Sequence, residues 1–247
     1  MLNDELLERY SRQILLPEID LAGQENIRGG SVLVVGCGGL GSMVALFLAG
    51  AGVGNLTLVD ADSVELSNLH RQLAFRESDI AQPKAQALKH QLLSLNSEIT
   101  VTSAVQRFGD DRESDAELLR AANIVIDATD NLASRHAIER STRDAQKPWI
   151  MGAATRLHGQ VAAFSQTRAE GCYQCLAPSE DNSRGFDCRN EGILGPVIGV
   201  IAAWQAQDAL MFLSGLPLEW GVLRIYDATQ QRIDRLVIAP RDGCHIS

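Results

Sequence analysis

Short apolar runs alternate with longer segments of helical character along the first two thirds of the chain, a pattern typical of strands that alternate with helices. The predicted strands are residues 32–35, a second run that ends at 60, and residues 100–104, 124–127, 149–153 and 159–164. The predicted helices are residues 42–52, 84–95, 115–121 and 132–145. This alternation predicts an α/β fold of the Rossmann-like kind, with an open sheet flanked by helices.

The N-terminal stretch lies outside this alternation. Residues 2–16 carry apolar side chains at helical spacing, with Asn3 as the candidate N-cap and Pro17 as the stop. Residues 24–28 add a second, shorter helical piece. Both pieces precede the first strand, so we expect residues 1–30 to form a helical arm outside the sheet.

The last third of the chain changes character. Its pattern predicts one long helix over residues 196–214, and then a hairpin made of residues 223–226 and 233–238. The apolar stretch 192–213 also holds Gln205, Gln207 and Asp208, so it is interpreted as a buried helix and not as a membrane span.

Composition narrows the class of protein. A chain of 247 residues can bury one large α/β core, and 45% hydrophobic with 21% charged residues is ordinary for a globular protein. A net charge of -9 provides no global basic field for nucleic acid or anionic membrane. The polar, acidic N-terminus does not resemble a secretory signal, and five cysteines, an odd number, favour reduced thiols in a cytoplasm.

A glycine-rich turn follows the first predicted strand. Gly36, Gly38 and Gly41 have the spacing G-x-G-x-x-G, and Asp60 stands about 20 residues further on at the end of the second strand. Glycines let backbone N–H groups approach phosphate oxygens at a helix N-terminus, and the Asp60 carboxylate can accept hydrogen bonds from ribose hydroxyls. The motif indicates a nucleotide without specifying which one.

Two cations and an acid are expected near that turn. Arg71 and Lys84 lie in segments on the carboxyl-end side of the predicted sheet, where their charges would neutralise a triphosphate; each is otherwise an ordinary surface cation. Asp130 comes just after the fourth strand. An acid beside a phosphate site is a natural Mg²⁺ ligand, and Asp130 is also a candidate N-cap for the helix that follows.

Cysteines near the C-terminus have the spacing of a metal site. Cys172 and Cys175 form a C-x-x-C pair, which is half of a tetrahedral zinc site, and Cys244 lies in a matching tail. Ser247 stands where a second C-x-x-C would have its last thiol, and His245 is the other good ligand in the tail. The sequence therefore predicts a structural zinc with three thiolates and an uncertain fourth ligand; the alternative is a redox or inert C-x-x-C.

Several motifs together resemble the bacterial MoeB/ThiF/HesA family, relatives of the ubiquitin-activating enzymes. They are RYSRQILL, GCGGLGS, LVDADSVELSNLHRQ, QPKA, DATDN, CYQCL, CRNEGILGPVIGV and the terminal GC, and they span nearly the whole chain, from Leu7 to Cys244. The resemblance implies a mixed, mostly parallel sheet flanked by helices, and a homodimer. The expected organisation is one adenylation domain over residues 1–247, with the arm 1–30, a nucleotide-binding half 31–153 and a carrier-binding, cysteine-rich half 154–247.

The resemblance also implies an activity. Members adenylate the C-terminal Gly-Gly carboxylate of a small ubiquitin-like sulfur carrier with Mg-ATP and release pyrophosphate, for molybdopterin or thiamine biosynthesis. Arg12 is expected to reach the site of the partner subunit, and Asp130 to ligate Mg²⁺. The residues implied to bind the nucleotide are Gly36, Gly38, Gly39, Gly41, Asp60, Ser67, Asn68, Arg71, Lys84, Asp130 and Asn131.

Cys188 has two interpretations. It lies in a Cys-Arg-x-x-Gly segment whose cysteine, in the thiamine branch of the family, takes part in sulfur transfer to the activated carrier. The alternative is a loop cysteine with no chemistry. The surrounding residues 182–189 are expected to form a crossover loop over the carrier tail.

Two other function classes share some of these features. An NAD-dependent oxidoreductase would use the same glycine turn and Asp60, and a non-catalytic dimeric scaffold would keep the fold alone. The oxidoreductase does not account for Arg71, Lys84 and Asp130 in one place, nor for the zinc-like cysteines. The scaffold does not account for the full set of phosphate-facing residues, so adenylation is the favoured hypothesis.

Overall fold

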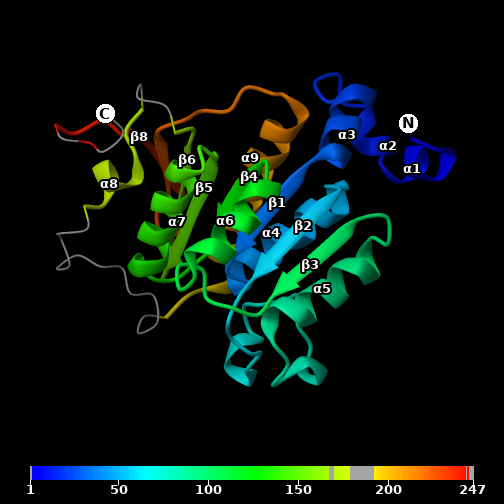
Figure 1. Ribbon diagram of the computed structural model, residues 1–247, viewed down its shortest axis with the longest axis horizontal. Helices are drawn as coiled ribbons and strands as arrows, with labels where there is room; N and C mark the ends of the chain where they lie inside the picture. Colours follow the sequence, from blue (N-terminus) through cyan, green and yellow to red (C-terminus); the bar gives the residue numbers. More distant parts are fainter. Residues whose placement is uncertain (1, 167–169, 179–191, 243, 245–247) are drawn as a thin grey trace.

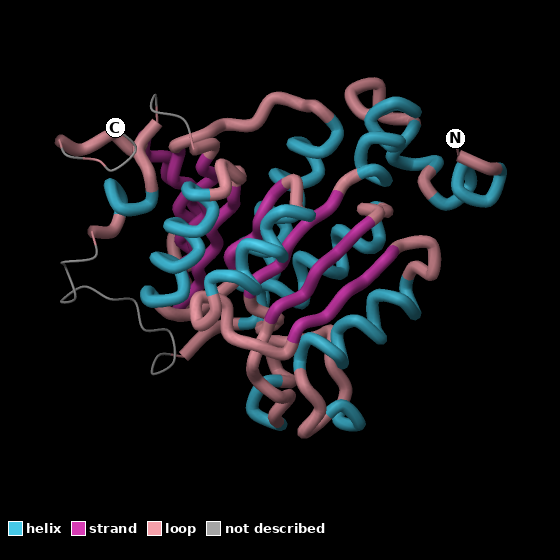
Figure 2. Tube along the Cα trace, in the orientation of Figure 1, coloured by secondary structure: helices cyan, strands magenta, loops and turns pink. Residues whose placement is uncertain are grey.

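The computed structural model describes residues 2–166, 170–178, 192–242 and 244, and builds one sheet of eight strands between two layers of helices (Figures 1 and 2). The strands are β1 (Ser31–Val35), β2 (Asn55–Val59), β3 (Thr100–Ala104), β4 (Ile124–Asp127), β5 (Trp149–Thr155), β6 (His158–Phe164), β7 (Val222–Asp227) and β8 (Arg232–Val237). Their order is β3-β2-β1-β4-β5-β6-β7-β8. The first five strands are parallel, and the last three join them in antiparallel pairs. The mixed, mostly parallel sheet is therefore confirmed.

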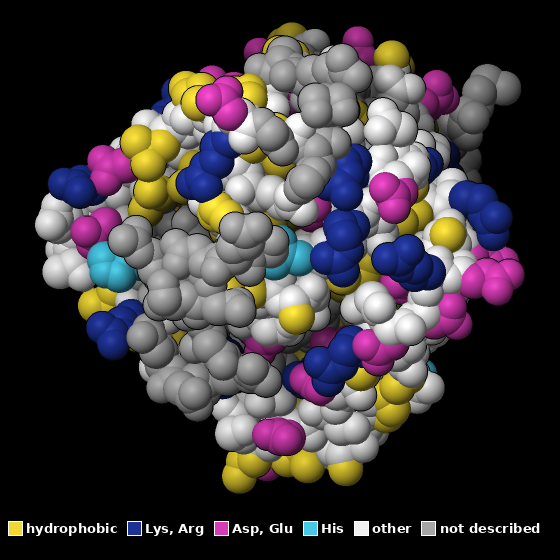
Figure 3. Space-filling model, turned by 60° about the vertical axis from the view of Figure 1, so that its left-hand side comes forward, with side chains coloured by type: hydrophobic (Ala, Val, Ile, Leu, Met, Phe, Trp, Pro, Cys, Tyr) yellow, Lys and Arg dark blue, Asp and Glu magenta, His cyan; other side chains and the backbone are white. Residues whose placement is uncertain are grey.

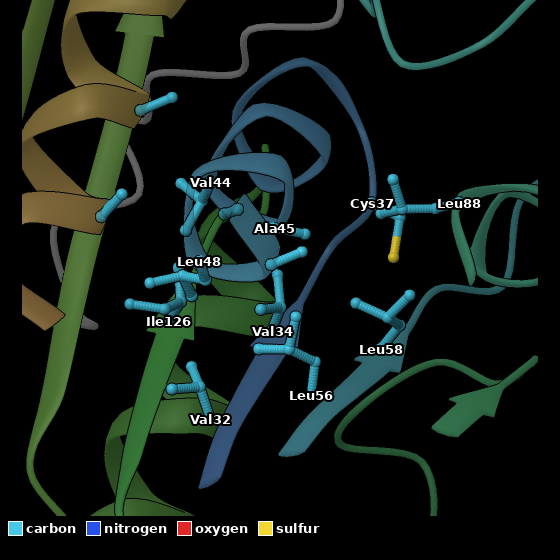
Figure 4. Packing of buried hydrophobic residues seen from close by; sticks show 14 of the residues in the cluster. Val32, Val34, Cys37, Val44, Ala45, Leu48, Leu56, Leu58, Leu88 and Ile126 are labelled. Carbon is cyan, nitrogen blue, oxygen red and sulfur yellow. The ribbon is translucent and has the colours of Figure 1, made fainter. Parts of the chain in front are cut away.

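Helices cover both faces of this sheet. The helices on one face are α4 (Gly39–Ala51), α5 (Lys84–Leu95) and α9 (Gly195–Ser214), and those on the other are α6 (Arg112–Ala121), α7 (Leu132–Asp144) and the single turn α8 (Tyr173–Leu176). Because both faces are covered, the central strands are apolar on both sides: Val32 and Val34 pack toward α4 (Figure 4), and Leu33 packs in the opposite cluster. This explains why the strands appear in the sequence as continuous apolar runs.

The N-terminal arm consists of three short helices, α1 (Asp4–Arg9), α2 (Ser11–Ile14) and α3 (Asp20–Gly29). The prediction of one helix over residues 2–16 is wrong, because the helix breaks at Tyr10. The Tyr10 side chain is buried against Gly52, and its hydroxyl accepts a hydrogen bond of 2.9 Å from Asn96 Nδ2. The packing of this ring against the rest of the protein therefore favours a break at Tyr10 over an uninterrupted helix. Asn3 caps α1 as predicted.

The long helix α9 is apolar and long enough to cross a membrane by length and composition alone. In this fold it packs against α4, α3 and β5. Its buried Gln205 donates hydrogen bonds to the backbone oxygens of Asp127 at 2.8 Å and Ile150 at 3.1 Å. These contacts are those of a core helix.

On the face shown in Figure 3, basic and acidic side chains are interspersed.

Two glycines of α4 differ in what surrounds them. A Cβ on Gly41 would lie 1.8 Å from the Gly36 carbonyl oxygen, whereas Gly50 meets nothing closer than 4.0 Å. We expect Gly41→Ala to lower the free energy of unfolding by roughly 2 kcal/mol or more, since backbone must move. Gly50→Ala is the matched control and should raise it by about 0.5–1 kcal/mol. Urea denaturation measures both, and similar shifts for the two variants would contradict this packing.

Candidate functional site

A cleft of about 800 Å³ opens at the carboxyl ends of β1, β2 and β4. After β1 the chain continues to β2 on one side, and after β4 it continues to β5 on the other side. Open α/β sheets hold their ligands at such a point, where the order of the strands reverses. The cleft brings together ten of the eleven residues implied to bind the nucleotide: Gly36, Gly38, Gly39, Asp60, Ser67, Asn68, Arg71, Lys84, Asp130 and Asn131. Gly41 does not line the cleft; it packs behind the turn against Gly36.

The glycine turn allows three chain segments to meet closely. Gly36 has φ +91°, and a Cβ there would lie 2.7 Å from the Ala128 carbonyl oxygen, so the end of β1 touches the end of β4. Helix α4 begins three residues later, at Gly39. Its first-turn N–H groups have no acceptor within the helix, and they carry the positive end of the helix dipole at the edge of the cleft. The turn is thus suited to an anionic ligand.

Asp60 is tied to the turn by its own carboxylate. Its Oδ2 accepts the Cys37 N–H at 2.6 Å, and its Oδ1 accepts the Asp62 N–H at 2.7 Å. Burial raises the pKa of Asp60, while these two hydrogen bonds and the charge of Lys84 oppose that rise. Each oxygen retains a second lone pair, so Asp60 can accept a further hydrogen bond from a ligand hydroxyl.

Both predicted cations face the cleft and are held by neighbours. Lys84 is 7% exposed, and its Nζ lies 3.0 Å from Asp62 Oδ2. Arg71 Nη1 donates to the Ser67 carbonyl oxygen at 2.9 Å and lies 2.8 Å from His70 Nε2. These contacts hold the two charges in place before any ligand arrives.

The turn after β4 presents Asp130. Asn131 caps α7, because its Oδ1 accepts the Ser134 N–H at 2.9 Å. The alternative role of Asp130 as the N-cap is therefore wrong, since its neighbour does that work. Asp130 is exposed and lines the cleft, with one oxygen 3.3 Å from Asn131 Nδ2. Its carboxylate is thus an exposed hydrogen-bond acceptor at the wall of the cleft.

Arg135 also lines the cleft, and sequence reasoning missed it. It is 3% exposed, and its Nη2 donates to the Thr129 carbonyl oxygen at 2.8 Å. Its Nε lies 3.8 Å from Asp127 Oδ2, and burial raises the pKa of Asp127 while the charge of Arg135 opposes it. One signal could have found it. Arg135 stands four residues, about one helical turn, after the N-cap Asn131, so it lies on the side of α7 on which the chain enters from β4.

Arg12 is not among the residues that line the cleft. It lies on α2, and the arm that carries it stands beyond the amino ends of the parallel strands, at the far end of the sheet from the cleft (Figure 1). Within one chain, Arg12 therefore does not reach the site.

Three of the predicted zinc ligands come together near the C-terminus. Cys172 Sγ lies 3.6 Å from Cys175 Sγ and 3.3 Å from Cys244 Sγ, and the last two sulfurs are 3.4 Å apart. Burial, with the neighbouring sulfurs, raises the pKa of the Cys172 thiol to about 12. Cys188, His245 and Ser247, and the expected loop 182–189, lie outside the described residues.

The glycine turn, an acid at the end of β2 and cations around one cleft define a Rossmann-like α/β protein whose cleft suits an anionic ligand. The sequence profile of the ThiF family matches residues 10–246, and the chain belongs to this family. The resemblance found in its motifs is thereby confirmed.

Proteins of known name are similar to this chain over nearly its whole length. The Escherichia coli (strain K12) sulfur carrier protein ThiS adenylyltransferase is 40% identical over 99% of this chain and 96% of its own length. The molybdopterin-synthase adenylyltransferase of Salmonella typhimurium is 37% identical, over 99% of this chain and 98% of its own. A crystal structure of E. coli MccB with ATP superposes with a TM-score of 0.84 at 25% identity, over 96% of this chain and 73% of that one.

Proposed function

We propose that this protein is an adenylyltransferase that transfers AMP from ATP to the C-terminal carboxylate of a small sulfur-carrier protein. One observation carries the proposal: Arg71, Lys84 and Asp130 face the same cleft as the glycine turn. Membership of the ThiF family and the two adenylyltransferases named above support it. They favour adenylation over the oxidoreductase and the scaffold that the sequence left open.

The reaction needs charge more than it needs a base. A carboxylate is ionised at pH 7 and attacks the α-phosphorus itself; the new C–O–P bond forms as the bond to pyrophosphate breaks. The difficulty is to bring two anions together. In this proposal the N–H groups at the start of α4 and the cations Arg71 and Lys84 offset their repulsion and stabilise the leaving pyrophosphate.

Mg²⁺ fits the acid at the end of β4. Asp130 offers an exposed hard oxygen at the edge of the phosphate space, which is the ligand type that Mg²⁺ shares with phosphates. A bound Mg²⁺ would supply further positive charge on the triphosphate. In this proposal Asp60, whose carboxylate also accepts the Cys37 N–H, accepts a hydrogen bond from a ribose hydroxyl.

Two kinds of carrier are candidates. One relative is named as the adenylyltransferase of the sulfur carrier ThiS, and the other as the adenylyltransferase of molybdopterin synthase. We propose a ubiquitin-like carrier with a C-terminal Gly-Gly, handled in the cytoplasm. The role of Cys188 in sulfur transfer stays a prediction from the sequence.

Zinc fits the cysteine cluster. A tetrahedral site with Zn–S bonds of about 2.3 Å separates its sulfurs by roughly 3.8 Å. The three distances here are 3.3, 3.4 and 3.6 Å, so a small outward shift accommodates the ion. We propose a structural zinc held by Cys172, Cys175 and Cys244, with a fourth ligand such as His245.

The arm suggests how Arg12 takes part. Because it cannot reach the cleft of its own chain, we propose a homodimer in which each Arg12 enters the partner's site. Exposed leucines on the arm, Leu15 and Leu16, supply apolar surface for such a contact.

Removal of Arg71 or Asp130 should slow the chemistry. We expect Arg71→Ala and Asp130→Ala to reduce carrier-dependent ATP–pyrophosphate exchange by roughly a hundredfold or more, with ThiS and the molybdopterin-synthase carrier tried in turn. Arg120→Ala is the control for Arg71→Ala. It removes the same positive charge from an exposed position on α6 that does not line the cleft. Near-normal exchange in Arg71→Ala or Asp130→Ala would remove that residue from the mechanism.

A mixing experiment tests Arg12. Arg12→Ala and Asp130→Ala should each be inactive alone. If Arg12 acts across the dimer, subunits mixed and re-associated should regain about a quarter of the parent rate, because half of the dimers then hold one intact site out of two. Two Arg12→Ala preparations mixed together serve as the control. No recovery in the mixed sample would place Arg12 outside the partner's site.

Metal analysis tests the cysteine cluster. Protein purified without chelator should hold about one zinc per subunit, and Cys244→Ser should hold less than about 0.2. Cys37→Ser is the matched control, because Cys37 is a buried thiol outside the cluster and its loss should leave the zinc in place. A parent protein with less than about 0.2 zinc would contradict the site.

A further inference from the structure

Gln72 lines the cleft but has no part in the function proposed so far. It is the last residue of the motif LVDADSVELSNLHRQ and stands directly after Arg71. The residue is only 3% exposed. Ala74 and Phe75, which follow it closely in the chain, are buried in the hydrophobic core cluster that also contains Val32. The segment that carries Gln72 is therefore fixed to the body of the protein.

The two ends of the Gln72 amide lie in different surroundings. Its Oε1 is buried and accepts no hydrogen bond from any of the described residues. Its Nε2 lies beside the glycine turn, 3.6 Å from the position that a Cβ of Gly38 would take. Gly38 lines the cleft and is the N-cap of α4. The donor end of the amide therefore adjoins the start of the helix, where the helix dipole favours an anion.

Packing alone does not explain a glutamine at this position. A buried amide oxygen without a partner lowers the stability of a protein. Methionine is unbranched and of similar length, so it would fill the same space without that penalty. An unsatisfied polar group in a folded protein calls for an explanation, and a ligand bound by the other end of the amide provides one.

A neutral amide also suits the electrostatics of the cleft. Arg71 and Lys84 already face this space, and a third cation beside them would be repelled whenever no anion is bound. The Gln72 amide adds N–H donors without adding charge. A hydrogen bond from such a donor to an ionised phosphate oxygen is stronger than one between two neutral groups.

We propose that Gln72 is a further nucleotide-binding residue, whose Nε2 donates a hydrogen bond to a phosphate oxygen held at the start of α4. The N–H groups of the helix and the amide of Gln72 then bind the same anion. This inference rests on the proposed binding of Mg-ATP in the cleft. It accounts for the buried Oε1, because the orientation that leaves this oxygen without a partner is the one that brings Nε2 beside Gly38.

Gln72→Met removes the amide and keeps the length of the side chain. We expect the Kd for Mg-ATP, measured by titration calorimetry, to rise roughly tenfold or more, as for the loss of one hydrogen bond to a charged group. The Kd for adenosine, measured by a ligand-observed NMR titration, should change less than about twofold, because adenosine has no phosphate to accept the bond. Gln72→Ala is the second variant and should show the same contrast between the two ligands.

Stability of the ligand-free protein provides an independent measurement. Because Oε1 of Gln72 has no partner among the described residues, Gln72→Met should leave the urea midpoint unchanged or raise it. Gln24→Met is the matched comparison. Gln24 is fully buried, and its amide accepts from Gln13 Nε2 at 2.8 Å and donates to the Ala51 carbonyl oxygen at 3.0 Å. Its loss should lower the midpoint, since these bonds are broken.

The outcomes separate the two proposals. No binding of Mg-ATP by the parent would refute the proposed function and this inference with it. Binding by the parent that both Gln72 variants leave unchanged would refute the inference alone. Equal weakening of Mg-ATP and adenosine, or a urea midpoint that falls as far in Gln72→Met as in Gln24→Met, would mean that Gln72 only supports the fold around the cleft, and would also overturn it.

Discussion

The structure depends on one close contact of backbone with backbone, at the point where β1 ends. Gly36 touches the carbonyl of Ala128, and Gly41 touches the carbonyl of Gly36, so neither position has room for a Cβ. This contact brings the start of α4 and the turn after β4 to opposite sides of one small space. The N–H groups of the helix and the carboxylate of Asp130 can then act on one ligand. A wider turn would separate the N–H groups of α4 from the Asp130 carboxylate.

Around that contact, the protein buries acids and surrounds them with donors. Asp127 is fully buried and Asp60 is partly buried, and burial raises the pKa of each. Backbone N–H groups on Asp60, and Arg135 with Thr129 on Asp127, compensate by favouring the ionised forms. These buried acids order the turns that carry the ligand-facing groups. The cations that face the cleft therefore stand on a scaffold whose geometry is already set.

Much of this could be predicted from the sequence, and the gaps have physical causes. The parallel strands appear as apolar runs because both of their faces are covered, and the glycine spacing identifies the turn because only glycine fits it. The break at Tyr10 escaped because the apolar periodicity continues through it, while the reason for the break lies far away at Asn96. The single turn α8 is too short to show a period. Arg135 could not be singled out because it lies one helical turn beyond the end of β4, in a helix that carries several other charged residues.

The contact between Gln205 of α9 and Gly152 of β5 restricts which residues these two positions can hold. A Cβ at Gly152 would lie 2.3 Å from the Gln205 amide, and that amide donates hydrogen bonds to the carbonyl oxygens of Asp127 at the end of β4 and Ile150 near the start of β5. A side chain at position 152 therefore requires a shorter residue at position 205, and a shorter residue there would not form these two hydrogen bonds. We expect positions 152 and 205 to change as a pair across descendants of this sequence, and any library that randomises one while fixing the other to yield few folded members.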